Sequence, residues 1–408
     1  MEQSRLPIEL CERVIDCLRK PQGPWWSRYS PLIERLPYRE GSEKPLRNLV
    51  ACARTCSAWY PRARLHIYYT VVFNYPIQAE LFMRSIQENP RLADLVHELM
   101  VYLPGEYYIP FVHGMLTKSL RNMHTMVLPL AGTSARSYPP HHHVLVTQFH
   151  LTELLLDLPT SEESTLLYAF RVIWSLRDLQ ILTVYLSHKA LVATDTLVRR
   201  MRSLRRPSSC SKLKVLTVRG YSLPQTMAIL PPFPFGTAVE KLCIQLNEPR
   251  PDEVPAEYTA SHAVMEQIRH FPLLQELRIH PEAIIRVPTS TVSWENISIT
   301  LPLILRALQS PGKLTVLNIM VNGHYLGATR DSLLSNLSQS KVDEILRNFP
   351  NLAVLCFELA ESATGGRDVA WWEEKLLDHL PALRGVLPIV AKITGRWSSR
   401  AWKEDSVQ

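Results

Sequence analysis

The chain has little glycine, with 14 glycines among 408 residues. It contains no Gly-x-Gly-x-x-Gly turn and no phosphate-binding Gly-Lys-Ser/Thr loop, so its sequence predicts no nucleotide site. The Gly-x-Ser-x-Gly elbow of serine hydrolases and the His-Glu-x-x-His zinc helix are missing as well. We therefore expect a protein that is not an enzyme and that uses no cofactor.

Cysteine is also scarce, and nothing about its placement indicates a metal site. Seven cysteines, an odd number, favour reduced thiols in a cytoplasmic or nuclear setting. The spacings from Cys11 to Cys17 and from Cys52 to Cys56 differ from the close Cys-x-x-Cys pairs of zinc sites. We expect these four side chains to serve as small buried apolar groups. The only histidine cluster, at 141–143, is expected in a surface loop.

Long apolar runs are missing too, so we expect no membrane span, and the mixed N-terminus predicts no signal peptide. The formal net charge is +7. Part of it lies in a basic run of Arg199, Arg200, Arg202, Arg205 and Arg206. An acidic partner is one interpretation of this run, and the solvated end of a helix is the one we favour. Without interleaved aromatic residues, nucleic acid is not an expected partner.

What the sequence does contain is a recurring strand pattern, apolar-x-x-apolar-x-apolar, from residue 95 onward. Its nine copies begin at Val96, Met123, Leu151, Leu179, Leu213, Val239, Leu274, Leu314 and Leu352. The alternation has the period of a β-strand. The early steps are close to the 20–29 residues of leucine-rich repeats, and the later steps are longer.

Helical patterns separate the strand copies. They fall at 75–88, 165–175, 194–204, 262–270, 301–308 and 340–348. Stacked helix–turn–strand units predict an α/β solenoid with an inner parallel sheet and outer helices. The repeats are irregular, because the consensus asparagine is mostly missing, and a generic α/β domain with one parallel sheet remains the alternative. A helix at 371–380, with Trp372, Leu376, Leu377 and Leu380, is expected to close the stack before a polar tail at 398–408.

The N-terminal region has a different, helical pattern. After Pro7, which suits a first helical turn, apolar residues recur at Leu10, Val14 and Leu18. A second amphipathic run covers 46–57, and Pro61 is expected to end that helix at or near Tyr60. Two short helices cannot bury all of their apolar surface, so either a partner or the rest of the chain must cover the remainder.

The opening Leu6-Pro7-Ile8-Glu9-Leu10 and the closing Cys52-x-x-x-Cys56-x-x-Trp59 resemble the F-box. This resemblance implies a helical F-box domain at 1–73 and a leucine-rich-repeat-like substrate-binding domain at 74–397. The F-box docks proteins onto the Skp1 adaptor of cullin-based ubiquitin ligases. An insert at 21–45 departs from the family, which usually joins these helices with few residues.

The resemblance also implies a set of Skp1-binding residues. They are Leu6, Pro7, Ile8, Leu10, Val14, Ile15, Leu18, Leu49, Val50, Cys52, Ala53 and Trp59. Packing inside the helical domain is the alternative for Leu10, Ile15 and Trp59. We expect a substrate-recognition subunit that holds an unknown protein substrate near the ubiquitin-transferring enzyme. The alternative function is a non-catalytic repeat scaffold that belongs to no ligase.

Overall fold

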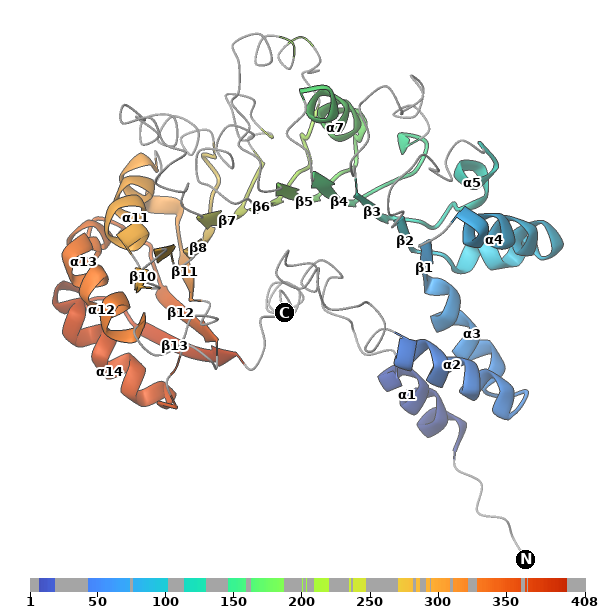
Figure 1. Cartoon of the computed structure of the whole chain (residues 1–408), viewed down its shortest axis with the longest axis horizontal. Helices are drawn as coiled ribbons and strands as arrows, with labels where there is room; N and C mark the ends of the chain where they lie inside the picture. Colours follow the sequence, from blue (N-terminus) through green and yellow to red (C-terminus); the bar gives the residue numbers. More distant parts are fainter. Residues whose placement is uncertain are drawn as a thin grey trace, which may run out of the picture.

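The computed structural model places three short helices beside an arc of parallel strands (Figure 1). The residues it describes are 7–18, 43–73, 76–101, 114–129, 146–158, 163–186, 200, 203, 209–219, 235, 238–246, 271–281, 284–286, 291–293, 295–308, 311–321, 329–360, 364 and 366–394. Most of the insert, the expected helix at 262–270 and the tail at 398–408 lie outside these residues. So does the expected helix at 194–204, apart from residues 200 and 203.

The N-terminal helices are α1 (Ile8–Leu18), α2 (Glu43–Thr55) and α3 (Tyr60–Tyr69). The prediction that Pro61 ends the second helix was wrong. That helix ends at Thr55, and Pro61 lies in the first turn of α3. A proline is tolerated there because the first N–H groups of a helix have no acceptor within it.

The described part of the chain forms one eleven-stranded sheet in which every neighbouring pair is parallel. Its strands are β1 (Thr70–Phe73), β2 (Glu98–Val101), β3 (Thr125–Pro129), β4 (Glu153–Leu158), β5 (Ile181–Leu186), β6 (Val215–Arg219), β7 (Lys241–Leu246), β8 (Glu276–Pro281), β11 (Val316–Val321), β12 (Val354–Ala360) and β13 (Ile389–Thr394). A separate antiparallel pair joins β9 (Ile284–Arg286) to β10 (Thr291–Ser293). The fold is therefore an α/β solenoid-like arc built on an open parallel sheet.

Each of the nine predicted strand segments contains one strand of this sheet, from β2 to β12. Two further strands, β1 and β13, extend it at its ends. Residues 70–73, which the predicted division groups with the helical domain, pair with β2. The helical unit therefore passes into the sheet at Tyr69 and Thr70.

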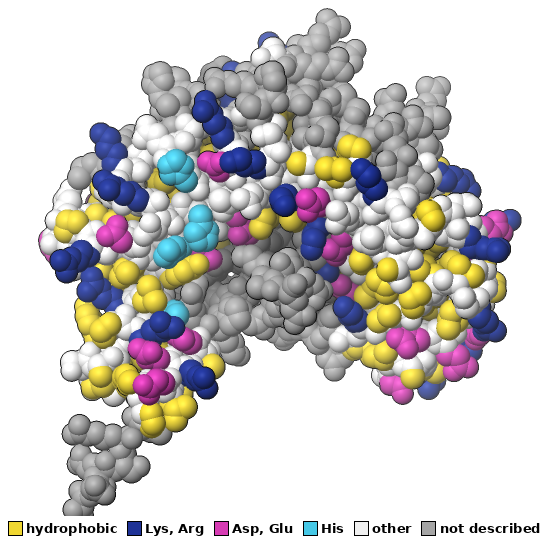
Figure 2. All heavy atoms as spheres, turned by 180° about the vertical axis from the view of Figure 1, so that it is seen from behind, with side chains coloured by type: hydrophobic (Ala, Val, Ile, Leu, Met, Phe, Trp, Pro, Cys, Tyr) yellow, Lys and Arg dark blue, Asp and Glu magenta, His cyan; other side chains and the backbone are white. Residues whose placement is uncertain are grey.

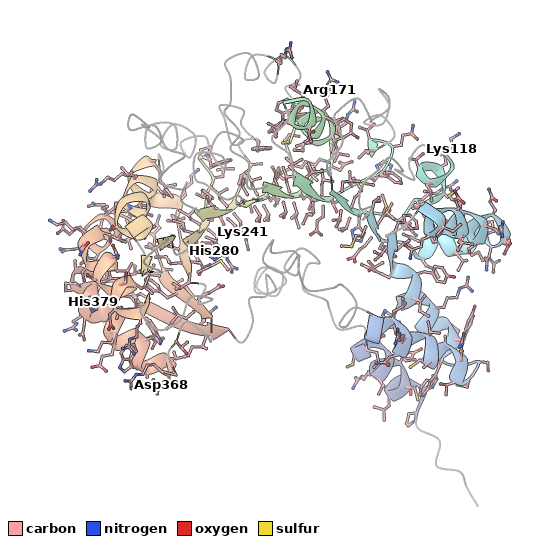
Figure 3. All side chains as sticks on the ribbon, in the orientation of Figure 1. Lys118, Arg171, Lys241, His280, Asp368 and His379 are labelled. Carbon is pink, nitrogen blue, oxygen red and sulfur yellow. The ribbon has the colours of Figure 1, made fainter. Side chains whose placement is uncertain are left out.

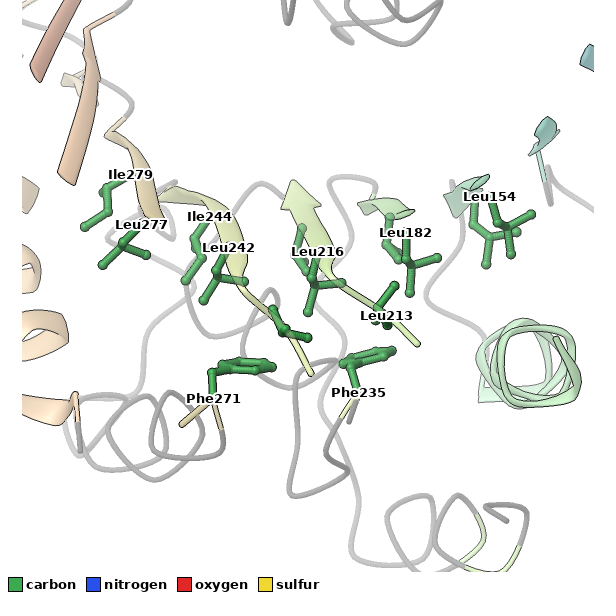
Figure 4. Packing of buried hydrophobic residues seen from close by; sticks show 14 of the residues in the cluster. Leu154, Leu182, Leu213, Leu216, Phe235, Leu242, Ile244, Phe271, Leu277 and Ile279 are labelled. Carbon is green, nitrogen blue, oxygen red and sulfur yellow. The ribbon is translucent and has the colours of Figure 1, made fainter. Parts of the chain in front are cut away.

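The register of the strands explains the core. It aligns Leu154, Leu182, Leu216 and Leu242 across four neighbouring strands, and each of these side chains is 0% exposed. Neighbouring strands lie about 4.8 Å apart, so one apolar position per unit becomes a continuous row. Figure 4 shows this row packed over Phe235 and Phe271, which come from the segments before β7 and β8.

Helices line the outer side of the arc (Figure 1). They are α4 (Pro76–Glu88), η2 (Pro90–Leu95), α5 (Gly114–Ser119), α7 (Glu163–Ser175), α11 (Glu295–Ala307), η5 (Pro311–Lys313), α12 (Thr329–Ser340) and α13 (Val342–Leu346). The predictions at 75–88, 165–175, 301–308 and 340–348 correspond to α4, α7, α11 and α13, whereas α5 and α12 were not predicted. None of the helices in the described ranges has the length and apolarity needed to cross a membrane.

The C-terminal end has two elements after the predicted helix. Helix α14 (Val369–His379) begins after Asp368, whose Oδ1 accepts the Trp371 N–H at 2.8 Å. Trp372, Leu376 and Leu380 are fully buried, as expected of a closing helix. A short turn, η7 (Pro381–Leu383), then leads into β13. The described sheet therefore continues by one strand after α14.

Candidate interaction surfaces

The three N-terminal helices have a small core of their own. Ile15, Leu49, Cys52 and Ala63 are buried together, one or two from each helix. Partly exposed side chains surround this centre: Leu18, Ala53, Trp59 and Ile67. The cluster is separate from the main core of the arc, so the helices form a packing unit of their own.

A polar contact links α1 to α3 in this unit. Arg62 donates from Nε to Asp16 Oδ1 at 2.6 Å and from Nη2 to Oδ2 at 2.7 Å. His66 Nε2 lies 2.7 Å from the same Oδ1. The two-pronged hydrogen bonding from Arg62 lowers the pKa of the Asp16 carboxyl to about 2. The contact joins residues 46 positions apart and so fixes how α1 sits on α3.

Apolar side chains also lie on the outside of this unit. Ile8 is 41% exposed, Leu10 46%, Val14 54% and Leu46 48%. Leu10 and Val14 are one helical turn apart and share a face of α1. Figure 2 shows apolar side chains among charged ones over these helices, at the lower left. Because the core beneath is already filled, such a group is what a binding partner would cover.

A hollow of about 580 Å³ lies beside α2. The described residues that line it are Leu46, Arg47, Val50, Ala51, Arg54 and Thr55. Leu46 and Val50 are four residues apart and form an apolar ridge along the helix. Arg47 and Arg54 lie two turns apart along one side of this ridge. Apolar contact and positive charge are therefore available in the same place.

The predicted Skp1-binding residues divide between the surface and the core. Pro7, Ile8, Leu10 and Val14 are exposed and Val50 is half-buried. The others pack in the core of the unit: Ile15, Leu18, Leu49, Cys52, Ala53 and Trp59. Ile15 and Trp59 therefore pack inside the helical domain, which was the alternative stated for them. Leu10, for which the same alternative was stated, is exposed. Leu6 lies outside the described residues.

Sequence reasoning omitted Leu46, Arg54 and Tyr60 from this surface. Leu46 precedes Val50 by one turn, so helical spacing alone could have placed it on the outer face of α2. Tyr60 is 48% exposed at the start of α3. It was missed because the separate helix α3 was not predicted.

The inner face of the sheet is a second candidate surface. One register row is apolar in the first four strands: Val72, Met100, Val127 and Leu155. The same row is mostly polar from β5 to β11: Thr183, Thr217, Cys243, Arg278 and Asn318. Figure 3 shows Lys241 and His280 on this inner side, opposite Arg171 on the outer helix α7. This row of the inner face is therefore apolar from β1 to β4 and mostly polar from β5 to β11.

Arg278 is the centre of an ion-pair network on the polar half. Its Nε lies 3.2 Å from Glu276 Oε1 and its Nη2 lies 3.3 Å from Glu358 Oε1. Lys241 Nζ lies 3.3 Å from Glu276 Oε2, and Asn318 Nδ2 donates to Glu276 Oε1 at 3.0 Å. Arg278 and Glu358 are each only 4% exposed. Burial raises the pKa of the neighbouring Cys356 thiol to about 11, so this group is not a thiolate nucleophile at neutral pH.

The remaining sequence features add no site among the described residues. No group of three or more possible metal ligands occurs within the described ranges. Cys11 and Cys52 are buried as expected, but Cys17 and Cys56 are exposed. Residues 141–143 lie outside the described ranges, and the basic run is described only at Arg200, which is exposed.

No protein-family model matches this chain, and a search of curated proteins finds no match. The likeness of its N-terminal region to the F-box therefore rests on the residues quoted from the sequence.

Proposed function

We propose that this protein is the substrate-recognition subunit of a Skp1–cullin–F-box-type ubiquitin ligase. Its N-terminal helices bind a Skp1-like adaptor, which connects it to a cullin, and its arc of leucine-rich-repeat-like units holds a protein substrate. The observation that carries the proposal is the position of Leu10, Val14 and Leu46. These apolar side chains are 46–54% exposed on a unit whose own core is already filled.

The connection between the two regions supports this role. Helix α3 ends at Tyr69 and β1 begins at Thr70, so no linker separates the helices from the sheet. Docking the helices would therefore fix the direction in which the inner face of the arc presents a substrate. The chain would act by proximity and orientation, while another subunit carries out the transfer of ubiquitin.

The test compares two charge substitutions in the full-length chain. Leu10→Glu/Val14→Glu places two carboxylates on the outer face of α1. Ile77→Glu/Leu81→Glu makes the same change on α4, where the two side chains are 56% and 53% exposed. Because both pairs have the same spacing and similar exposure, the second variant is a matched control. We expect the first pair to weaken capture of purified Skp1 about 100-fold, and the second to leave it unchanged.

Two outcomes would contradict the proposal. Equal capture by both variants would show that the outer face of α1 is not the docking surface. Failure of the wild-type chain to bind Skp1 would favour the alternative of a repeat scaffold outside a ligase. Matching far-ultraviolet circular dichroism spectra would show that neither variant acts by unfolding the helices.

A further inference from the structure

The C-terminal end of the described sheet is an edge strand. β13 comes last in the order of the sheet, and among the described strands it pairs only with β12. It lies at the end of the arc, and α14 packs against it (Figure 1). The edge of a sheet carries a row of backbone N–H and C=O groups with which another strand can pair. Such an edge can join one molecule to another.

The hydrogen bonds to β12 define which backbone groups of β13 face outward. Leu355 on β12 donates its N–H to the Pro388 carbonyl at 3.1 Å, just before β13 begins. Because alternate residues of a parallel strand bond to the same neighbour, Val390 and Lys392 direct their backbone groups to β12 as well. The residues that direct theirs to the open side are Ile389, Ala391 and Ile393. β13 therefore presents three residues to a further strand.

The central outward N–H of β13 already has an acceptor. Ala391 donates it to Glu373 Oε1 at 3.0 Å, and Glu373 belongs to α14. The carboxylate therefore lies on the open edge, where Glu373 is half-buried and Ala391 is 3% exposed. A charged acceptor makes a stronger hydrogen bond with a backbone N–H than a neutral one does. A further strand would have to displace this carboxylate before it could pair with Ala391.

The outward residues of β13 are complementary to a second copy of themselves. In an antiparallel pair of two β13 strands centred on Ala391, Ile389 of one copy would face Ile393 of the other. Both copies would use the same residues, as a two-fold axis requires. On the inner face, Lys392 would lie opposite Val390 rather than opposite a second lysine, so no like charges would meet. The edge therefore fits the β13 strand of a second copy of this chain.

We propose that the edge of β13 is an interface with a second copy of this chain, and that the Glu373 carboxylate keeps this interface closed. With Glu373 on the Ala391 N–H, the sheet ends within one molecule. When Glu373 is displaced, two arcs join through β13 and the sheet continues across the two-fold axis. The interface lies at the opposite end of the arc from the N-terminal helices (Figure 1), so the inference does not depend on the proposed function.

The experiment measures self-association of the full-length chain by sedimentation equilibrium. Glu373→Ala removes the acceptor, and we expect it to raise the dimer association constant about 100-fold, which is about tenfold for each copy that no longer has to break this hydrogen bond. Glu374→Ala is the matched control, because it removes the same side chain from the next position of α14, where it is exposed. This control should leave self-association unchanged.

Two further variants separate the hydrogen bond from the charge. Glu373→Gln keeps an acceptor oxygen at the same reach, so it should self-associate no more than wild type. Glu373→Asp keeps the charge but is one methylene shorter, so it should self-associate like Glu373→Ala. Far-ultraviolet circular dichroism shows whether each variant is folded, and Glu373→Asp decides the matter if Glu373→Ala is not. Wild-type self-association in both the alanine and the aspartate variant would overturn the inference.

A proline shows whether the association uses β13. Ile393→Pro removes an N–H that faces away from β12, and an edge strand tolerates proline at such a position. Added to Glu373→Ala, it should return self-association to the wild-type value. A dimer that persists in this double variant would contradict the proposal, because its contact would lie elsewhere. A wild-type dimer that Ile393→Pro alone dissociates would also contradict it, since Glu373 would then not close the edge.

Discussion

Apolar side chains are exposed to solvent to different extents in the N-terminal helices and in the arc. In the arc, the row through Leu154, Leu182, Leu216 and Leu242 is 0% exposed on every strand. In the helical unit, five large apolar side chains, Tyr60 among them, are 41–54% exposed around a core cluster of four buried residues. Both regions are amphipathic in sequence, so composition alone does not explain the contrast.

The difference lies in the number of neighbours that each unit has. An interior unit of the arc is covered by the units before and after it, and helices such as α7 and α11 cover the outer side where the structure describes it, so its apolar face is completed within the chain. Three short helices have too little surface to enclose all of their apolar residues. Surface that the chain leaves uncovered in this region is available to a partner.

The largest expected effect is a core truncation in the arc. Leu216→Ala removes a fully buried side chain from the middle of the leucine row. It should lower the free energy of unfolding by about 4 kcal/mol, through lost apolar burial and the cavity that remains. Leu10→Ala makes the same chemical change at a side chain that is 46% exposed. It should change stability by no more than about 0.5 kcal/mol. Chemical denaturation of the two variants measures both values, and similar losses would remove the contrast between the regions.

Ion pairs provide the next comparison. Arg278 and Glu358 have side chains that are 5% exposed, whereas Arg62 and Asp16 are 37% and 38% exposed. Arg278→Met leaves the buried Glu358 and the partly buried Glu276 without their central partner, so we expect a loss of about 3 kcal/mol in the free energy of unfolding. Adding Glu358→Gln to that variant should recover part of the loss, because one uncompensated charge is removed. A loss below that of Arg62→Met would contradict the prediction.

A core truncation in the helical unit should have a smaller and local effect. Ile15→Ala removes a fully buried side chain from the core of this unit. We expect a loss of about 2 kcal/mol, at the low end for such truncations, because a small unit can relax around the cavity. Hydrogen exchange should speed up in α1 to α3 and remain unchanged in β5 to β8. Faster exchange in both regions would show that they unfold together.

The strands of the arc were predictable because their signal is local. Each carries alternating apolar residues within about six positions, and repetition made the pattern visible. The end strands were harder to recognise. In the unit that contains β1, a tyrosine occupies the first apolar position of the repeated pattern. In β13, Ala391 lies where most copies of the pattern have a larger apolar side chain. The strands β9 and β10 are only three residues long each, which is too short for the alternating pattern of a strand to be recognised.

The surfaces were less predictable because they depend on how elements meet. Val14 and Ile15 are adjacent and both apolar, yet one is 54% exposed and the other 0%. Periodicity defines a stripe on α1, but only the positions of α2 and α3 decide which edge of the stripe is covered. The network around Arg278 joins strands that are far apart in sequence, with Glu358 80 positions away. A single sequence gives no signal for such a pairing.

The smallest expected effect concerns Asp16 and pH. Its pKa is lowered from 3.8 to about 2 in the folded chain, so folding favours the carboxylate. The stabilisation is therefore complete above pH 4 and is lost as pH falls toward 2 and the group becomes protonated. Asp16 is 38% exposed and partly screened by water, so Asp16→Asn should cost only about 1 kcal/mol at pH 7. At pH 2, where about half of the Asp16 carboxyls in the folded chain are protonated, most of this difference should be gone. Denaturation followed by the amide signals of α1 and α3 measures this difference in stability. A loss of stability in Asp16→Asn that is the same at pH 7 and pH 2 would show that the contact with Arg62 stabilises the unit by packing rather than by charge.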